Sequence, residues 1–101
     1  MEQGNDLIAF NQEVTSAIDL YESLNQHVAI NTKNMIAKHG KILALSRLMS
    51  TPDAQKGFKV LRDSNQLDRT FEAIVTRYAH LFAADIVDAA RWRLEHAYEL
   101  L

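Results

Sequence analysis

The sequence predicts an all-α protein, and three observations lead to this prediction. Its 101 residues include only three glycines and one proline, so few positions interrupt a regular backbone. No segment alternates apolar and polar residues over the length of a β-strand. Apolar residues instead recur every three or four positions over residues 7–49, which is the spacing that places side chains on one face of a helix.

Length and composition predict one domain that spans residues 1–101. The hydrophobic fraction of 48% and the charged fraction of 24% are typical of a folded protein. The chain contains no cysteine, which excludes disulfide bonds and thiolate metal sites. Its first ten residues are acidic and polar, and no apolar stretch approaches the roughly 18 residues that cross a bilayer. We therefore expect a cytoplasmic protein with no secretory signal and no membrane partner.

The first expected element is a helical stripe in residues 5–50. Counted in steps of three and four, the stripe consists of Leu7, Phe10, Val14, Ala17, Tyr21, Leu24, Val28, Asn31, Met35, Lys38, Ile42, Leu45 and Met49. Eleven of these thirteen positions are apolar, and the two exceptions fall within residues 27–40. Such a stripe is typical of a helix that packs along its length against another helix, as in a coiled coil.

Three architectures fit residues 5–50. A turn at residues 31–34 is favoured by four weak or neutral helix formers. A break at Gly40 is favoured by the two basic residues before it, Lys38 and His39. An unbroken helix is favoured by the preserved register, and about 45 residues of it would extend roughly 67 Å. The rest of so short a chain could not cover a helix of that length.

Three shorter helices are expected in the C-terminal half. Thr51 as a cap and Pro52 at the first position predict a helix to about Arg62. Ser64 or Asn65 would cap the next helix, and Asp85 would cap a last helix that is docked at its end. Five aromatic residues in this half are expected to pack in the core, namely Phe71, Tyr78, Phe82, Trp92 and Tyr98.

Charge is unevenly distributed along the chain. Residues 1–30 carry a net charge of −5, residues 31–62 carry +6, and residues 63–101 carry −3. We therefore expect the middle segment to lie beside something acidic. The candidates are the first segment of the same chain, another copy of the chain and a separate partner.

No pattern of catalytic or metal-binding residues is present. The four histidines are scattered, and no two of them lie three or four residues apart as metal ligands on one helix would. The sequence also has no nucleophile elbow and no glycine-rich phosphate loop. We therefore expect no metal, no cofactor and no enzymatic activity.

One short motif in the last helix needs separate consideration. The four-residue separation of Arg91 and His96 is similar to that in HEPN-type ribonucleases, which are all-α and dimeric. That resemblance implies an imidazole acting as acid or base and a guanidinium that steadies the phosphate. The simpler interpretation is a solvated helix face on which Arg91 pairs with Glu95. No other part of the chain resembles that family.

The basic middle segment suggests nucleic-acid binding as an alternative function. Five cations could contact phosphates without reading sequence, namely Lys33, Lys41, Lys56, Lys59 and Arg62. The acidic segments on both sides argue against it.

The favoured hypothesis is a non-enzymatic protein–protein interaction module. The sequence contains no pattern of catalytic or metal-binding residues. Its apolar stripe is longer than the rest of the chain can easily cover. We expect a helical homodimer that acts as a small adaptor, a chaperone-like binder or an inhibitor. The residues expected to line the self-association contact are Leu7, Phe10, Val14, Tyr21 and Leu24.

Overall fold

The computed structural model describes residues 2–50 and 52–100, and within them the chain is all-α, as predicted. The α-helices are α1 (Glu2–Asn25), α2 (Ile30–His39), α3 (Lys41–Leu48), α4 (Pro52–Asp63), α5 (Phe71–Arg77) and α6 (Ala84–Glu95). Two short 3-10 helices, η1 (Leu67–Arg69) and η2 (Ala79–Leu81), flank α5. The described residues contain no β-strand.

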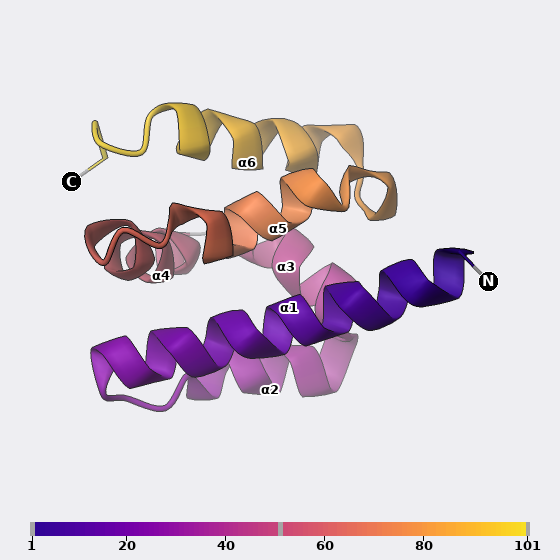
Figure 1. Ribbon diagram of the computed structural model, residues 1–101, viewed down its shortest axis with the longest axis horizontal. Coiled ribbons are helices and arrows are strands. Elements are labelled where there is room, and N and C mark those ends of the chain that lie inside the picture. The colour runs from indigo at the N-terminus through magenta and orange to yellow at the C-terminus, as the bar shows by residue number, and fades with distance from the viewer. Residues whose placement is uncertain (1, 51, 101) are drawn as a thin grey trace.

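The chain turns back after α1, so the prediction of one unbroken helix is wrong. The predicted turn at residues 31–34 is also wrong, because these residues lie inside α2. The turn occupies residues 26–29 and begins at Gln26, whose φ is +58°. Figure 1 shows α2 running in the opposite direction to α1 after this turn, and we call α1, the turn and α2 the α1–α2 hairpin.

The carboxylate of Glu22 explains why the turn lies at this point. It accepts a hydrogen bond from the backbone N–H of Ala29 at 2.6 Å, just before the first residue of α2. It also pairs with Lys33 Nζ at 2.9 Å, one turn further along α2. One α1 side chain therefore satisfies a backbone donor at the start of α2 and fixes its direction.

The predicted break at Gly40 is confirmed. Gly40 has a φ of +83°, which glycine adopts at low cost, and its N–H donates to the Ile36 carbonyl at 2.8 Å. Lys38 and His39 form the basic last turn of α2. The chain changes direction here and enters α3.

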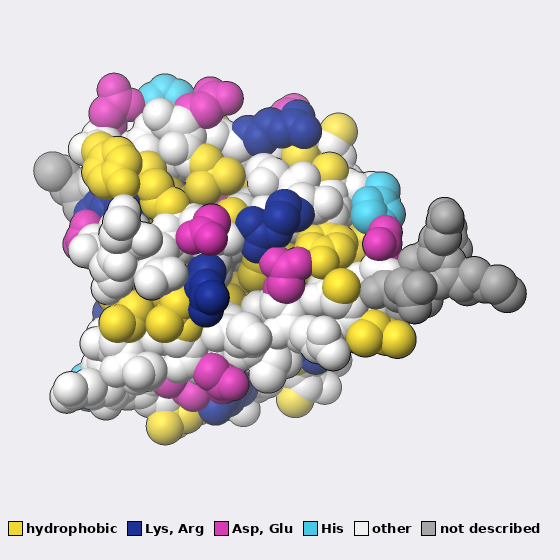
Figure 2. Space-filling model, in the orientation of Figure 1, with side chains coloured by type: hydrophobic (Ala, Val, Ile, Leu, Met, Phe, Trp, Pro, Cys, Tyr) yellow, Lys and Arg dark blue, Asp and Glu magenta, His cyan; other side chains and the backbone are white. Residues whose placement is uncertain are grey.

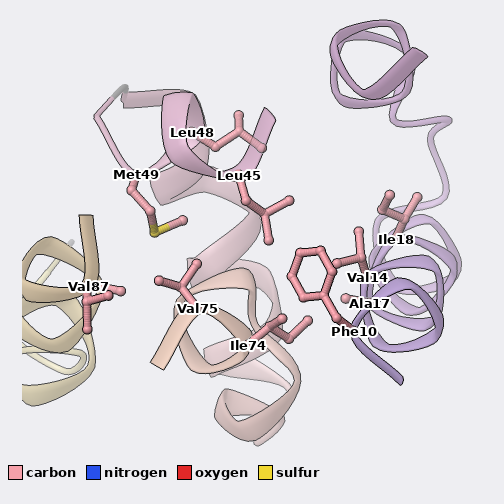
Figure 3. Close-up of a cluster of buried hydrophobic side chains, with 11 residues drawn as sticks. Phe10, Val14, Ala17, Ile18, Leu45, Leu48, Met49, Ile74, Val75 and Val87 are labelled. Carbon is pink, nitrogen blue, oxygen red and sulfur yellow. The ribbon is translucent and has the colours of Figure 1, made fainter. Parts of the chain in front are cut away.

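The core combines side chains from α1, α3, α5 and α6 (Figure 3). Phe10 and Val14 of α1 are completely buried, as is Leu45 of α3. In Figure 3 the Phe10 ring points from α1 toward Ile74 and Leu45. The apolar stripe is therefore only partly buried: its members Phe10, Val14 and Leu45 share one core, whereas its members Leu7, Leu24, Val28 and Ile42 remain exposed.

The predicted aromatic core is correct for three of its five members. Phe71, Tyr78 and Phe82 pack against the buried cluster. Phe10 meets the Tyr78 and Phe82 rings edge to face, at centroid distances of 5.5 and 5.9 Å. The prediction is wrong for Trp92 and Tyr98, which are exposed on and just after α6.

A buried ion pair connects α5 and α6 to the end of α3. Arg93 Nη1 lies 3.0 Å from Glu72 Oε2, and both side chains are at least nine-tenths buried. Arg93 Nη2 donates to the Met49 carbonyl oxygen at 2.8 Å. Because the last carbonyls of a helix lack partners within it, this guanidinium also completes the C-terminus of α3.

The C-terminal helices follow the predicted order, with shifted boundaries. Helix α4 begins at Pro52 as expected, whereas the predicted cap Thr51 lies outside the described residues. Thr70, and not Ser64 or Asn65, caps α5, because its Oγ1 accepts from Ala73 N–H at 3.1 Å. Asp85 lies in the first turn of α6 and does not cap it.

The segment after α6 is docked against α4. Arg62 Nη1 donates to the carbonyl oxygen of Ala97 at 2.7 Å and also to that of Leu100. In Figure 1 the C-terminal end of α6 and the α1–α2 turn lie at the same end of the molecule, on the left. The described residues include no helix that is apolar over a length sufficient to cross a membrane.

Removing the Glu72 carboxylate tests the role of the buried ion pair. We expect Glu72→Ala to lower the free energy of unfolding by about 3–5 kcal/mol, because the Arg93 guanidinium stays buried without its counter-charge. Glu72→Gln keeps an oxygen acceptor and most of the volume, so its loss should be smaller. Urea denaturation measures both changes. A loss from Glu72→Ala below about 1 kcal/mol, as for a surface pair, would contradict this assignment.

Candidate functional site

A pocket of about 320 Å³ lies between the α1–α2 hairpin and α4, with α3 and α5 behind it. Its walls are mainly apolar and include Ile18, Met35, Leu48, Phe58, Leu61 and Phe71. This volume lies within the range of pockets that hold small ligands or a partner's side chain. A second, more open hollow of about 570 Å³ lies beside α1 and α5, and its lining is more charged, with Glu13, Asp68, Arg69 and Arg77.

Three exposed apolar side chains surround the turn beside this pocket. Val28 and Ile30 are 62% and 59% exposed, and both line the pocket. Leu24 is 42% exposed and lies one helical turn beyond Tyr21, a pocket residue of α1. We call these three residues the apolar rim. A concave apolar surface with such a rim marks an interaction site more often than a solvated end of a hairpin.

The polar groups at the pocket carry positive or no charge. Lys56 and His27 are exposed, and Lys56 forms no ion pair with another described residue. Asn25 Nδ2 donates to the Tyr21 hydroxyl at 3.1 Å. Glu72, the one acid of the lining, is neutralised by Arg93. Residues 23–52 contain no aspartate or glutamate.

Gly57 is part of the pocket wall. It lies within α4, where glycine costs roughly 1 kcal/mol relative to alanine. A Cβ at this position would lie 3.9 Å from two carbons of the Tyr21 ring. This distance is an ordinary van der Waals contact, so an alanine would fit against Tyr21 at the pocket wall.

The predicted self-association residues separate into three groups. Phe10 and Val14 are completely buried in their own subunit and offer no surface to a second copy. Leu7 is partly exposed near the start of α1, roughly 25 Å along the helix from Leu24. Tyr21 lines the pocket, and Leu24 is exposed one helical turn beyond it.

The five predicted phosphate-binding cations do not share one surface. Lys33 pairs with Glu22, and the Arg62 guanidinium is used by carbonyl oxygens and by Asp63 at 2.9 Å. Lys41 and Lys59 are half-buried in α3 and α4. Lys56 alone among the five lines the pocket.

A smaller cationic group lies at the junction of α2 and α3. Burial, together with the nearby charges of Arg47 and Lys38, lowers the pKa of His39 below its ordinary value. These charges have no carboxylate partner among the described residues. They form a small positive surface where α2 meets α3.

No hydrogen bond joins Arg91 and His96 among the described residues. The His96 ring stacks on Trp92 with a centroid distance of 4.3 Å, and its Nδ1 donates to the Trp92 carbonyl oxygen at 2.7 Å. His96 lies just beyond the end of α6. The alternative pairing of Arg91 with Glu95 is also absent from the described residues. The same residues contain no cluster of three side chains suited to a metal ion.

Comparison of the chain with protein-family models, curated proteins and solved structures gives no match. The pocket must therefore be interpreted from its own geometry. Sequence reasoning missed Val28 and Ile30 as site residues, although two large apolar side chains in the least helical segment were a usable signal.

The Glu22 carboxylate should make the hairpin sensitive to acid. Hydrogen bonds from Lys33 and from the Ala29 backbone hold the pKa of Glu22 below its ordinary value. A lowered folded-state pKa means that the stabilisation is present at neutral pH and is lost as pH falls through that pKa. We expect Glu22→Gln to lower the melting temperature at pH 7, and the difference from wild type to shrink toward pH 3.

Thermal melts followed by circular dichroism between pH 3 and pH 7 measure this difference. Asp19→Asn is the matched control, because Asp19 is exposed on α1 and pairs with no described cation. A pH-independent difference for Glu22→Gln would show that its charge does not stabilise the hairpin.

Proposed function

We propose that the protein is a non-enzymatic interaction module that captures an apolar side chain of a partner protein in the pocket at the α1–α2 hairpin. The observation that carries this proposal is the apolar pocket together with its exposed apolar rim. Adaptors, chaperone-like binders and small inhibitors all work by such capture. In many protein interfaces, a few side chains buried in central pockets contribute most of the binding energy.

The rim favours a macromolecular partner over a small metabolite. A ligand that fills about 320 Å³ would leave Leu24, Val28 and Ile30 in water. A protein segment can place one side chain in the pocket and cover the rim with its neighbours. Burial of the rim would contribute roughly 25 cal/mol per Å² of apolar surface, before the costs of association.

The charge around the pocket supports an acidic partner segment. Lys56 and His27 are exposed beside it, and residues 23–52 carry no acid. Carboxylates on the partner would approach without like-charge repulsion and would be steered by the positive surface. The expected partner therefore presents an apolar anchor flanked by aspartate or glutamate.

A soluble dye of matching chemistry tests the pocket directly. ANS (anilinonaphthalene sulfonate) carries an apolar ring system and one negative charge. We expect ANS to shift the NMR amide signals of Val28, Ile30 and Gly57 while the cooperative melt of the protein is unchanged. Val28→Asp should weaken ANS binding by about tenfold or more, because it adds a negative charge to the apolar rim.

Leu43→Asp is the matched control for this experiment. Leu43 is 46% exposed on α3 and does not line the pocket, so this variant should bind ANS as wild type does. Equal weakening in both variants, or ANS shifts confined to other helices, would contradict the proposed pocket.

Nucleic-acid binding is a second candidate, favoured by the unpaired charges of Lys38 and Arg47 around His39. It is weaker because Lys33 and Arg62 already have partners within the chain. We expect labelled duplex and single strands to show no binding at low salt, where phosphate-driven affinity is greatest. Saturable binding that Arg47→Glu abolishes would favour nucleic acid over a protein partner.

A further inference from the structure

We propose that the partner at the hairpin pocket is a second copy of this chain, whose C-terminal end of α6 covers the apolar rim. This inference rests on the proposed function and names the occupant of the same pocket. Three features support it: the exposed aromatic and acidic residues at the end of α6, the opposite charges of the two surfaces, and the position of both surfaces at one end of the molecule.

The end of α6 has the chemistry that the pocket requires. Trp92, in its last turn, is 52% exposed, and Tyr98, just after it, is 75% exposed. Glu95 and Glu99 are exposed between and beside these two aromatic residues. Figure 2 shows apolar and acidic side chains next to each other over this end of α6, at the upper left. This segment is an apolar anchor flanked by carboxylates.

Charge complementarity connects the two surfaces. Glu95 forms no ion pair with another described residue, and Glu99 reaches only His96, at 3.8 Å. The pocket of the second copy offers Lys56 and His27, with no acid in residues 23–52. The pairing also accounts for the uneven charge along the chain, because the acidic C-terminal segment of one copy meets the basic middle segment of the other.

Both surfaces lie at one end of the molecule. Figure 1 places the α1–α2 turn and the C-terminal end of α6 together on the left. A two-fold axis beyond this end lets each copy insert its α6 end into the other copy's pocket, so the same contact forms twice and the assembly closes as a dimer. Surfaces on opposite faces would instead have produced an open chain of copies.

The distribution of exposed apolar residues agrees with this assembly. Nine large apolar side chains are exposed among the described residues. Five of them belong to the two proposed surfaces, namely Leu24, Val28, Ile30, Trp92 and Tyr98. Isolated exposed apolar residues need no explanation, whereas a concentration at one end of a small protein indicates an interface.

The test measures the mass of the protein in solution over a range of concentrations. We expect sedimentation velocity to give the mass of two chains, with dissociation on dilution. Trp92 is the only tryptophan of the chain, so its fluorescence reports on the α6 surface without a label. Its emission should shift to shorter wavelength as the dimer forms.

Three variants separate this contact from other modes of association. Val28→Asp in the rim and Tyr98→Asp after α6 should each give a single chain, because each places a carboxylate inside the contact. Leu43→Asp lies on α3, outside both surfaces, and should remain a dimer. All three positions are exposed, and a cooperative melt verifies that each variant folds.

A single chain at every wild-type concentration would overturn the proposal. A dimer that survives Val28→Asp or Tyr98→Asp, or that is lost in Leu43→Asp, would also overturn it, because the contact would then lie elsewhere. ANS competes with the second copy for the rim, so ANS binding measured on the dilute single chain distinguishes this failure from failure of the proposed function. A monomeric wild type that still binds ANS at the rim keeps the pocket and excludes the second copy as its occupant.

Discussion

The arrangement of α3, α5 and α6 depends on one buried guanidinium. Arg93 of α6 pairs with Glu72 of α5 and donates to the carbonyl oxygen of Met49, next to the last residue of α3. Burial raises the pKa of the Glu72 carboxyl, and the Arg93 charge offsets only part of that desolvation. Such a pair contributes more to the specificity of the arrangement than to its stability. It also fixes the inner wall of the pocket, to which Leu48 and Glu72 both contribute.

The sequence predicted the helices better than their connections. Pro52 and Gly40 gave correct boundaries, because each acts through the backbone of its own position. The apolar stripe correctly identified Phe10, Val14 and Leu45 as one buried set. It did not reveal the turn between them, because periodicity records which face of a helix is buried and not whether the helix is continuous. The turn depends on Glu22 and Ala29, seven residues apart and too distant for a helical pair.

Only part of the candidate site was predicted from the sequence, because the exposure of a side chain depends on how the whole chain folds. Tyr21 and Lys56 were selected from the sequence and do line the pocket, whereas Leu24 is exposed one turn beyond Tyr21. Arg62 looked like a free cation until the segment after α6 supplied carbonyl acceptors 35 and 38 residues away. Trp92 was predicted to lie in the core because its spacing is helical. Helical spacing does not show whether another helix packs against the face that carries it. These outcomes depend on contacts between distant segments.

The pocket wall formed by α2 is less constrained than the core. No residue of α2 is fully buried, and the helix is held by Glu22 at one end and by the Gly40 break at the other. Binding segments are usually drawn from the least stable parts of a fold, because they must adjust to a partner. Phe10 and Val14 belong to the buried core and do not line the pocket, whereas Val28 and Ile30 of the rim do. Changes at exposed rim positions should therefore alter binding while the fold persists, which makes the interaction surface and the core separately testable.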